Sequence, residues 1–148
     1  MRKLLPPILF VMFIAAMCVI CWALGMNHLI PTPYHVAGLP LLLGGLALAA
    51  TGKKVFRQRN TNIMTFGQPD VLVTDGIFQY TRNPMYLGFC IALTGVAILI
   101  GGSIIALLLT ALFLWITDRW YIAFEEQMMR NTFGAEYDAY CQKVRRWI

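Results

Sequence analysis

The fold is decided by residues 84–117, which read PMYLGFCIALTGVAILIGGSIIALLLTALFLWIT and contain no charged side chain. As one α-helix this run would be about 50 Å long, against a bilayer hydrocarbon core of about 30 Å. The run must therefore be broken, and Gly101-Gly102-Ser103 lies near its middle, where glycine allows a tight reversal. We predict a helical hairpin with arms at 86–100 and 104–117. Each arm is short for a full span, which favours a tilted hairpin or one that ends before the far surface.

The composition of the whole chain excludes a water-soluble protein. Of its 148 residues, 59% are hydrophobic and 13% are charged, whereas about 25% are charged in soluble domains. Two more apolar segments, 4–24 and 34–51, flank the turn-rich stretch 25–33 and predict another hairpin. The expected fold class is an all-α integral membrane protein, with about four transmembrane helices in two hairpins followed by C-terminal cytoplasmic helices. A single domain is expected over 1–148.

The charged side chains occupy separate blocks, which are Arg2-Lys3, then 53–82, then 118–146. Two hairpins place these blocks on one side of the membrane, together with both termini and all 12 Lys and Arg residues. The positive-inside rule makes that side the cytoplasm. Four spans fit this rule better than three, because a single helix over 84–117 would put the last basic block outside. The segments 53–85 and 118–148 are therefore expected to hold a cytoplasmic site.

Two features near the N-terminus have alternative interpretations. The basic start followed by an apolar run could belong to a signal peptide, but Pro6-Pro7 interrupts the run and no small-x-small cleavage site follows, so we expect an uncleaved first span. Cys18 and Cys21 have the spacing of a redox or metal pair, yet no second ligand pair lies nearby. We interpret them as small helix residues, interpret His28 and His35 as interfacial polar residues, and expect no metal site.

The central charged block leads into a motif at the start of the third span. Residues 71–80 are rich in β-branched and aromatic side chains, and they continue directly into Thr81-Arg82-Asn83-Pro84-Met85-Tyr86-Leu87-Gly88. Pro84 favours a helix start with Asn83 as its N-cap. Free amides at a helix start attract an anion, and Arg82 would add a bidentate clamp. Gly88 would let another element pack closely, although a simple cap with interfacial Arg and Tyr explains the spacing equally well.

Glu125-Glu126 lies in the predicted extension of the fourth helix. Adjacent side chains on a helix point about 100° apart, so we expect one carboxylate to face solvent and the other to face a pocket formed with the Arg82–Tyr86 segment. A carboxylate near a hydrophobic boundary needs a cationic or hydrogen-bonding partner, which favours a functional role. Gly134 is expected to end this helix. The basic and aromatic tail, 143–147, is typical of an anchor on anionic lipid.

Together these motifs resemble the isoprenylcysteine carboxyl methyltransferase family and its phospholipid methyltransferase relatives, in particular their small bacterial-type members. The residues that carry the resemblance lie within 71–148, about half of the chain, and they are 72–88, Glu125-Glu126, Phe133-Gly134, Tyr137, Tyr140 and Val144-Arg145-Arg146-Trp147. The first hairpin matches only as hydrophobic sequence. The resemblance implies a membrane methyltransferase-like domain (EC 2.1.1.-) that uses S-adenosyl-L-methionine. The cofactor would enter a pocket among the C-terminal helices from the cytosol, and a lipophilic acceptor would enter from the bilayer.

The resemblance also implies the residues of the site. Matched position by position, it assigns cofactor binding to Asp70, Val71, Leu72, Val73, Phe78, Asn83, Pro84, Met85, Tyr86 and Glu125. Catalytic or acceptor-facing roles fall to Arg82, Arg119, Tyr121 and Glu126. In this scheme Arg82 holds the carboxylate end of the cofactor and Arg119 meets an anionic acceptor. Glu126 is the candidate for proton removal from an amine or a thiol.

Two positions depart from the family's pattern. The usual histidine is Asn83 here, which can cap a helix and form hydrogen bonds but cannot titrate. The family's substrate arginine, four residues before the first glutamate, is matched by Tyr121, while Arg119 lies two positions away. These departures concern the acceptor more than the cofactor.

The sequence leaves the methyl acceptor and two other functions open. A prenylated cysteine, a phospholipid amine, or a small lipophilic thiol or acid would each suit a pocket open to the membrane. An NADPH-dependent membrane reductase is the alternative enzyme, because sterol reductases resemble the family in their C-terminal part, although the short chain argues against it. A non-enzymatic small membrane protein with a lipid-binding basic face is the other alternative. We expect no nucleic-acid partner and a location in a bacterial inner (cell) membrane.

Overall fold

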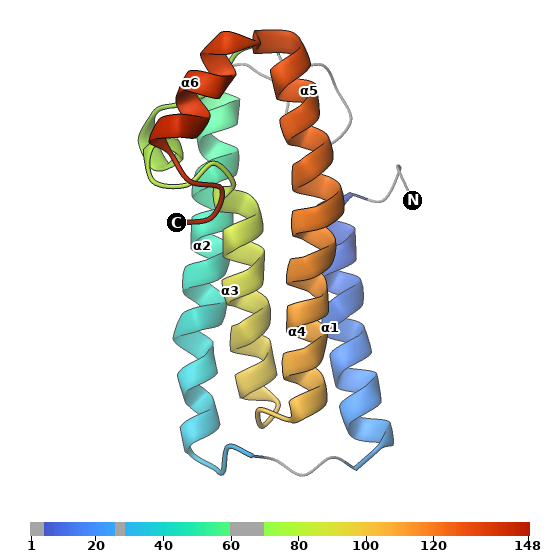
Figure 1. The fold of residues 1–148 in the computed structure, drawn as a ribbon. Helices are drawn as coiled ribbons and strands as arrows, with labels where there is room; N and C mark the ends of the chain where they lie inside the picture. The colour runs from blue at the N-terminus through green and yellow to red at the C-terminus, as the bar shows by residue number, and fades with distance from the viewer. Residues whose placement is uncertain (1–4, 26–28, 60–69) are drawn as a thin grey trace.

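The computed structural model describes residues 5–25, 29–59 and 70–148, and these contain helices and loops without a β-strand. Four helices stand side by side (Figure 1), namely α1 (Pro6–Ala23), α2 (Gly38–Gln58), α3 (Pro84–Leu99) and α4 (Ile104–Ile116). α4 continues through a π-helical segment, Thr117–Ile122, into α5 (Ala123–Phe133), and α6 (Ala135–Lys143) folds back beside it. Short 3₁₀ helices lie at Tyr34–Ala37 and Gly76–Gln79. The predicted all-α fold is confirmed.

The predicted reversal between the third and fourth helices is confirmed. Gly101 and Gly102 have φ angles of 97° and 66°, a left-handed conformation that suits glycine. Ser103 is the N-cap of α4, and its Oγ accepts a hydrogen bond of 3.2 Å from the backbone N–H of Ala106. Figure 1 shows this turn at the same end of the bundle as the end of α1 and the start of α2. The second hairpin therefore runs parallel to the first, as the charge pattern requires.

Among the residues that the structure describes, three helical stretches are long and apolar enough to cross a membrane, Pro6–Ala23, Tyr34–Gln58 and Ile104–Phe133. The apolar α3 is shorter at 16 residues. The second stretch runs two turns beyond the predicted end at 51, because the flexible stems of lysine and arginine let a helix carry charges past the apolar region. The third stretch has 30 residues and would be about 45 Å long, so it extends beyond a hydrocarbon core of about 30 Å. It ends at Gly134 as predicted, where φ is 51°.

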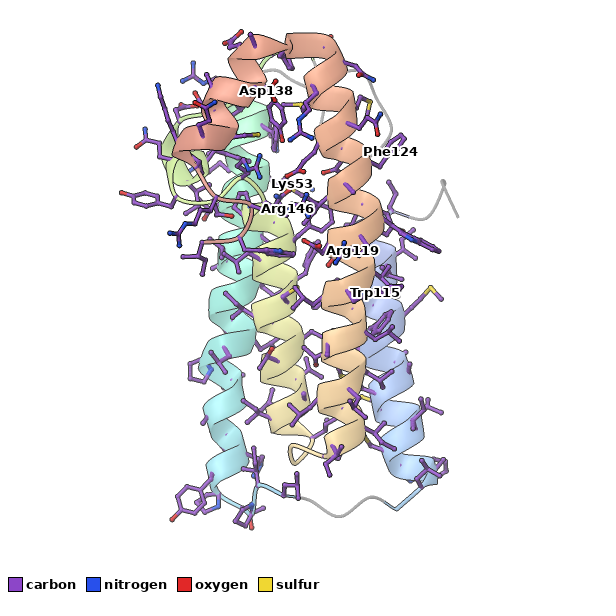
Figure 2. All side chains as sticks on the ribbon, in the orientation of Figure 1. Lys53, Trp115, Arg119, Phe124, Asp138 and Arg146 are labelled. Carbon is purple, nitrogen blue, oxygen red and sulfur yellow. The ribbon has the colours of Figure 1, made fainter. Side chains whose placement is uncertain are left out.

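The side chains on the outer surface of the bundle are those of a protein surrounded by lipid. Large apolar residues are exposed along the helices, including Val11, Val19, Leu43 and Leu108. Trp115 and Phe124 also project outward from the long α4–α5 helix (Figure 2). Exposed apolar surface on this scale marks an interface with another apolar phase, and on these helices it fits a bilayer.

Glycines set the close packing of α2 on α3. A Cβ atom placed on Gly45 would lie 2.5 Å from the backbone oxygen of Gly88, and one placed on Gly88 would lie 2.5 Å from the backbone oxygen of Gly45. Gly38 and Gly95 face each other in the same way, with a Cβ on Gly38 only 2.3 Å from the oxygen of Gly95. Small residues at such crossings let two helix backbones approach in a membrane. The close contact predicted at Gly88 is thus confirmed, with α2 as the partner.

Aromatic and aliphatic side chains join α1 to the second hairpin. Phe10 stacks on Phe89 of α3 at 5.0 Å, and Phe13 meets Phe113 of α4 edge to face at 5.4 Å. Met17 is fully buried among these helices. This packing brings the start of α1 beside the start of α3, where the site lies.

Candidate active site

A cavity of about 320 Å³ opens at the end of the bundle opposite the Gly101-Gly102 turn. Its walls come from the starts of α1 and α3, the end of α2, the loop before α3, and α5 and α6. The lining residues are Leu5, Pro6, Pro7, Lys53, Phe56, Val71, Val73, Phe78, Arg82, Asn83, Pro84, Met85, Tyr86, Phe89, Glu125, Glu126, Met129, Tyr137 and Tyr140. This volume is at the lower end of the range for small-molecule sites. The mixture of aromatic and charged walls suits an amphiphilic ligand.

The cavity gathers most of the residues that the sequence predicts for the site. Those on its walls are Val71, Val73, Phe78, Arg82, Asn83, Pro84, Met85, Tyr86, Glu125 and Glu126. Asp70, Leu72, Arg119 and Tyr121 are not among them. The Arg82–Tyr86 segment and Glu125-Glu126 are about 40 residues apart in the sequence, yet both line the cavity. They meet because the α3–α4 hairpin returns the chain to the level of the α3 start.

Three of the predicted site residues that do not line the cavity have other surroundings. Asp70 is exposed, and Leu72 packs against the cluster of Tyr137, Tyr140 and Val144. The Arg119 side chain is 70% exposed on the outer surface, 3.8 Å from the carboxylate of its neighbour Asp118. The structure therefore does not bring Arg119 to the cavity as a partner for an anionic acceptor.

Tyr121 lies behind the cavity wall rather than on it. Its ring centroid is 6.3 Å from that of Tyr86, which does line the cavity. Tyr121 belongs to the π-helical segment that joins α4 to α5. A π-helical turn changes the direction in which the following side chains point, and such turns are frequent at functional sites. The helix register around the glutamates consequently differs from that of a regular helix.

Glu125 reaches across the cavity to α3. The Tyr86 hydroxyl donates a hydrogen bond of 2.7 Å to Glu125 Oε1. In the part of the chain that the structure describes, Glu125 makes no ion pair. The expectation that one glutamate of the pair would face solvent is wrong, because both line the cavity. The cavity is wide enough around α5 to receive two side chains about 100° apart.

Glu126 is held between two guanidinium groups. Its carboxylate lies 3.0 Å from a nitrogen of Arg82, and it accepts bonds of 3.0 and 2.6 Å from Arg146. The Glu126 side chain is only 6% exposed. Arg146 also contacts Asp118 at 3.1 Å, so two cations and two anions balance in one network. This arrangement gives Glu126 a structural task, since a buried charge needs close partners.

The C-terminal tail closes one side of the site. The backbone oxygen of Arg146 accepts a bond of 3.0 Å from the Asn83 side chain, and the backbone oxygen of Arg145 accepts a bond of 3.1 Å from the N–H of Arg82. Trp147 Nε1 donates to Asp118 at 2.9 Å. The tail is thus tied to the start of α3 and to the long helix, and its interpretation as a lipid anchor is wrong for Arg146 and Trp147. Hydrogen bonds to Glu126 are the main cause that raises the pKa of the Arg146 guanidinium.

The start of α3 differs in detail from the predicted helix cap. Pro84 is the first helical residue and Asn83 occupies the N-cap position, but the Asn83 side chain forms no capping bond and donates to the tail instead. Arg82 is likewise not a free clamp, because it pairs with Glu126 and donates to the thiol of Cys141. Its buried Nε–H lacks an acceptor among the described residues.

Several lining residues were not predicted from the sequence. Lys53 and Phe56 lie three residues apart, on one face of the part of α2 beyond the predicted span. The Phe56 ring meets the Phe78 ring edge to face at 5.0 Å, and Tyr140 of α6 donates a bond of 2.6 Å to the backbone oxygen of Phe78. Burial raises the pKa of Tyr140. The spacing of Lys53 and Phe56 indicates one helix face, but the predicted span ends at 51 and does not include them.

The fold and the cavity define a helical membrane protein with a partly polar site at one end of its bundle. Residues 33–136, more than half of the chain, match the family model described as phospholipid methyltransferase, and the chain belongs to this family.

The chain is similar to three curated relatives over about half its length. It is 40% identical over 74 residues to "Protein-S-isoprenylcysteine O-methyltransferase" of Schizosaccharomyces pombe, covering 50% of this chain and 31% of that protein. It is 36% identical over 73 residues to "Probable protein-S-isoprenylcysteine O-methyltransferase" of Oryza sativa subsp. indica, covering 49% and 38%. It is 29% identical over 80 residues to "Methanethiol S-methyltransferase 1" of Bradyrhizobium diazoefficiens, covering 54% and 27%. The matches therefore span 27–38% of these relatives.

Proposed function

We propose that this protein is a membrane methyltransferase that uses S-adenosyl-L-methionine and acts on a lipophilic acceptor. The observation that carries the proposal is that Asn83–Tyr86 and Glu125-Glu126 line the same cavity, in a chain of the phospholipid methyltransferase family. The relatives described above carry methyltransferase names with two different acceptors, an isoprenylcysteine and methanethiol. The reaction class is common to both names, whereas the acceptor differs.

The walls fit the chemical groups of this cofactor. S-adenosyl-L-methionine combines an aromatic base, a sulfonium, an amine and a carboxylate. The Glu125 side chain can accept a hydrogen bond from an amine, and the face of the Tyr86 ring suits a cationic group. The guanidinium of Arg82, which lines the cavity, suits the cofactor's carboxylate. Phe78 offers an apolar wall for the base.

The protein's own contribution is to position the reactants and exclude water. When bound, the cofactor supplies an electrophilic methyl group: the acceptor's electron pair forms the new bond to carbon while the carbon–sulfur bond breaks, and that bond's electrons remain on the departing thioether. Holding both partners in a dry cavity can supply much of the rate. A carboxylate acceptor needs no base, which agrees with the engagement of Glu126 by two arginines. We therefore assign Glu126 to positioning rather than to proton removal.

We infer that the acceptor enters from the bilayer and the cofactor from the cytosol. The start of α1 and the end of α2 give the cavity an apolar side at Leu5, Pro6 and Phe56. The opposite side carries the ion-pair network of α5 and the tail. The described basic residues lie mostly at this end of the bundle. By the positive-inside rule, this supports a position of the end that carries the cavity at the cytoplasmic face of the cell membrane.

Binding of S-adenosylhomocysteine to the purified protein tests the proposal by calorimetry, with NADPH titrated in parallel. We expect the first to bind and the second not to bind. Glu125→Gln should weaken the binding of S-adenosylhomocysteine by about tenfold or more, since a hydrogen bond to a charged group contributes about 1.5–3 kcal/mol. Glu136→Gln, the same change at an exposed position of α6, is the control and should leave the affinity unchanged.

Each other outcome has a definite meaning. Binding of NADPH alone would identify a reductase, and binding of neither compound would point to a non-enzymatic membrane protein. An unchanged affinity in Glu125→Gln would remove that residue from the cofactor site. Incubation with methyl-labelled S-adenosyl-L-methionine and a total lipid extract would then show which acceptor carries the label.

A further inference from the structure

The charges on the cavity wall are not all neutralised within the protein. Arg82 is paired with Glu126, and Arg146 behind it is paired with Glu126 and Asp118. Lys53 also lines the cavity, but it makes no ion pair with any residue that the structure describes. Within the described lining, Lys53 is the cation whose charge remains available.

Lys53 belongs to a different part of the chain from the motif residues. It lies in the last two turns of α2, beside Phe56 on the apolar side of the cavity. Figure 2 shows Lys53 on the inner side of the long α4–α5 helix, while Phe124 projects from its outer side. Lys53 and its neighbour Lys54 are both exposed, but only Lys53 lines the cavity. A lysine with an apolar stem along such a wall can place its ammonium group at the polar end of a lipid-like molecule.

We propose that Lys53 binds a singly charged anionic headgroup of the lipophilic acceptor. This inference rests on the proposed function and adds to it a residue that recognises the charged end of the acceptor, a carboxylate or a phosphodiester on an apolar chain. One available ammonium group matches one negative charge, whereas a doubly charged phosphate commonly recruits arginine pairs. Arg119 does not compete for this role, because its side chain is on the outer surface.

A matched pair of ligands tests the charge requirement on the full-length protein in detergent micelles. The probes are N-acetyl-S-farnesylcysteine, which carries a carboxylate, and its primary carboxamide, which has the same chain without the charge. Calorimetry is run with S-adenosylhomocysteine present. We expect the wild type to prefer the acid about tenfold or more, Lys53→Met to lose this preference, and Lys54→Met to keep it.

A second arm identifies the source of the anion. A lysophospholipid with a phosphodiester headgroup is used to displace the bound acid from the wild type and from both variants. Displacement in the wild type and in Lys54→Met, but not in Lys53→Met, would extend the site to phospholipid headgroups. An acid preference without displacement would restrict it to carboxylates. Both results support the role of Lys53.

The affinity for S-adenosylhomocysteine separates this inference from the proposed function. If the wild type does not bind that compound, the proposed function fails, whatever the acceptor probes show. If Lys53→Met binds it more weakly than Lys54→Met, then Lys53 serves the cofactor and the inference is overturned. Two other results would also overturn the inference. One is equal binding of acid and amide by the wild type without displacement by the lysophospholipid. The other is a preference for the acid that survives in Lys53→Met.

Discussion

Replacement of Arg146 by methionine removes the guanidinium that joins the C-terminal tail to the long helix. We expect it to lower the free energy of unfolding by about 2 kcal/mol. The guanidinium makes two bonds to Glu126, at 3.0 and 2.6 Å, and one to Asp118 at 3.1 Å. A bond of this charged kind contributes about 1.5–3 kcal/mol. The sum is reduced because the Arg146 side chain is 33% exposed and because Glu126 keeps its ion pair with Arg82.

Removal of the charge on the partner carboxylate, by Glu126→Gln, should lower the free energy of unfolding by more, about 3–5 kcal/mol. It leaves two guanidinium groups facing a neutral amide, and Arg82 is only 11% exposed, so its charge cannot be solvated fully. The measurement is denaturant-induced unfolding of the protein in detergent micelles, followed by tryptophan fluorescence. Arg145→Met is the matched control, because this neighbouring side chain is exposed and makes no ion pair within the described residues. It should change the free energy by less than about 0.5 kcal/mol.

Two results would refute this reasoning. If Arg146→Met and Arg145→Met have the same effect, the tail is held by its general positive charge, as a lipid anchor would be. If Glu126→Gln is less destabilising than Arg146→Met, the carboxylate is not the centre of the network.

Two further predictions concern packing and a buried hydrogen bond. Gly45→Ala should destabilise the protein by about 1–3 kcal/mol, because the new Cβ would lie 2.4 Å from a backbone nitrogen of α3. Gly44→Ala has open space around it and should be neutral or stabilising by about 0.5–1 kcal/mol; equal melting temperatures for the two variants would contradict the packing. Tyr140→Phe should cost about 1–3 kcal/mol, because it leaves the backbone oxygen of Phe78 without its bond of 2.6 Å. Tyr80→Phe, at an exposed ring, is the control in the same unfolding assay.

Local patterns explain why much of the fold was predictable. The length of the uncharged run 84–117 forces a break, and Gly101-Gly102-Ser103 is the local sequence that can supply it. Pro84 starts a helix because its ring sets φ and its missing N–H is not needed there. Gly134 ends the long helix for a similar local reason, a positive φ. Each of these features depends on a few neighbouring residues, so no knowledge of the packing was required.

The residues of the site were less predictable because their partners are distant in the chain. The resemblance placed Arg82 and Glu126 in the site, but their pairing and the involvement of Arg146 depend on the return of the tail to the start of α3. The position of Arg119 on the outer surface depends on the π-helical segment, which no sequence pattern indicated. Lys53 lines the cavity because α2 continues past the apolar region.

The sequence by itself determined the membrane character, the two hairpins, and the gathering of charged residues at one end of the bundle. These properties follow from hydrophobic length and charge, which are local quantities. Only the tertiary structure decided which charges neutralise one another and which remain available. An ion pair depends on a separation of about 4 Å between side chains, and separations between distant segments are set by helix packing. Glu126 and Lys53 illustrate the two results, one carboxylate enclosed by arginines and one lysine facing an open cavity.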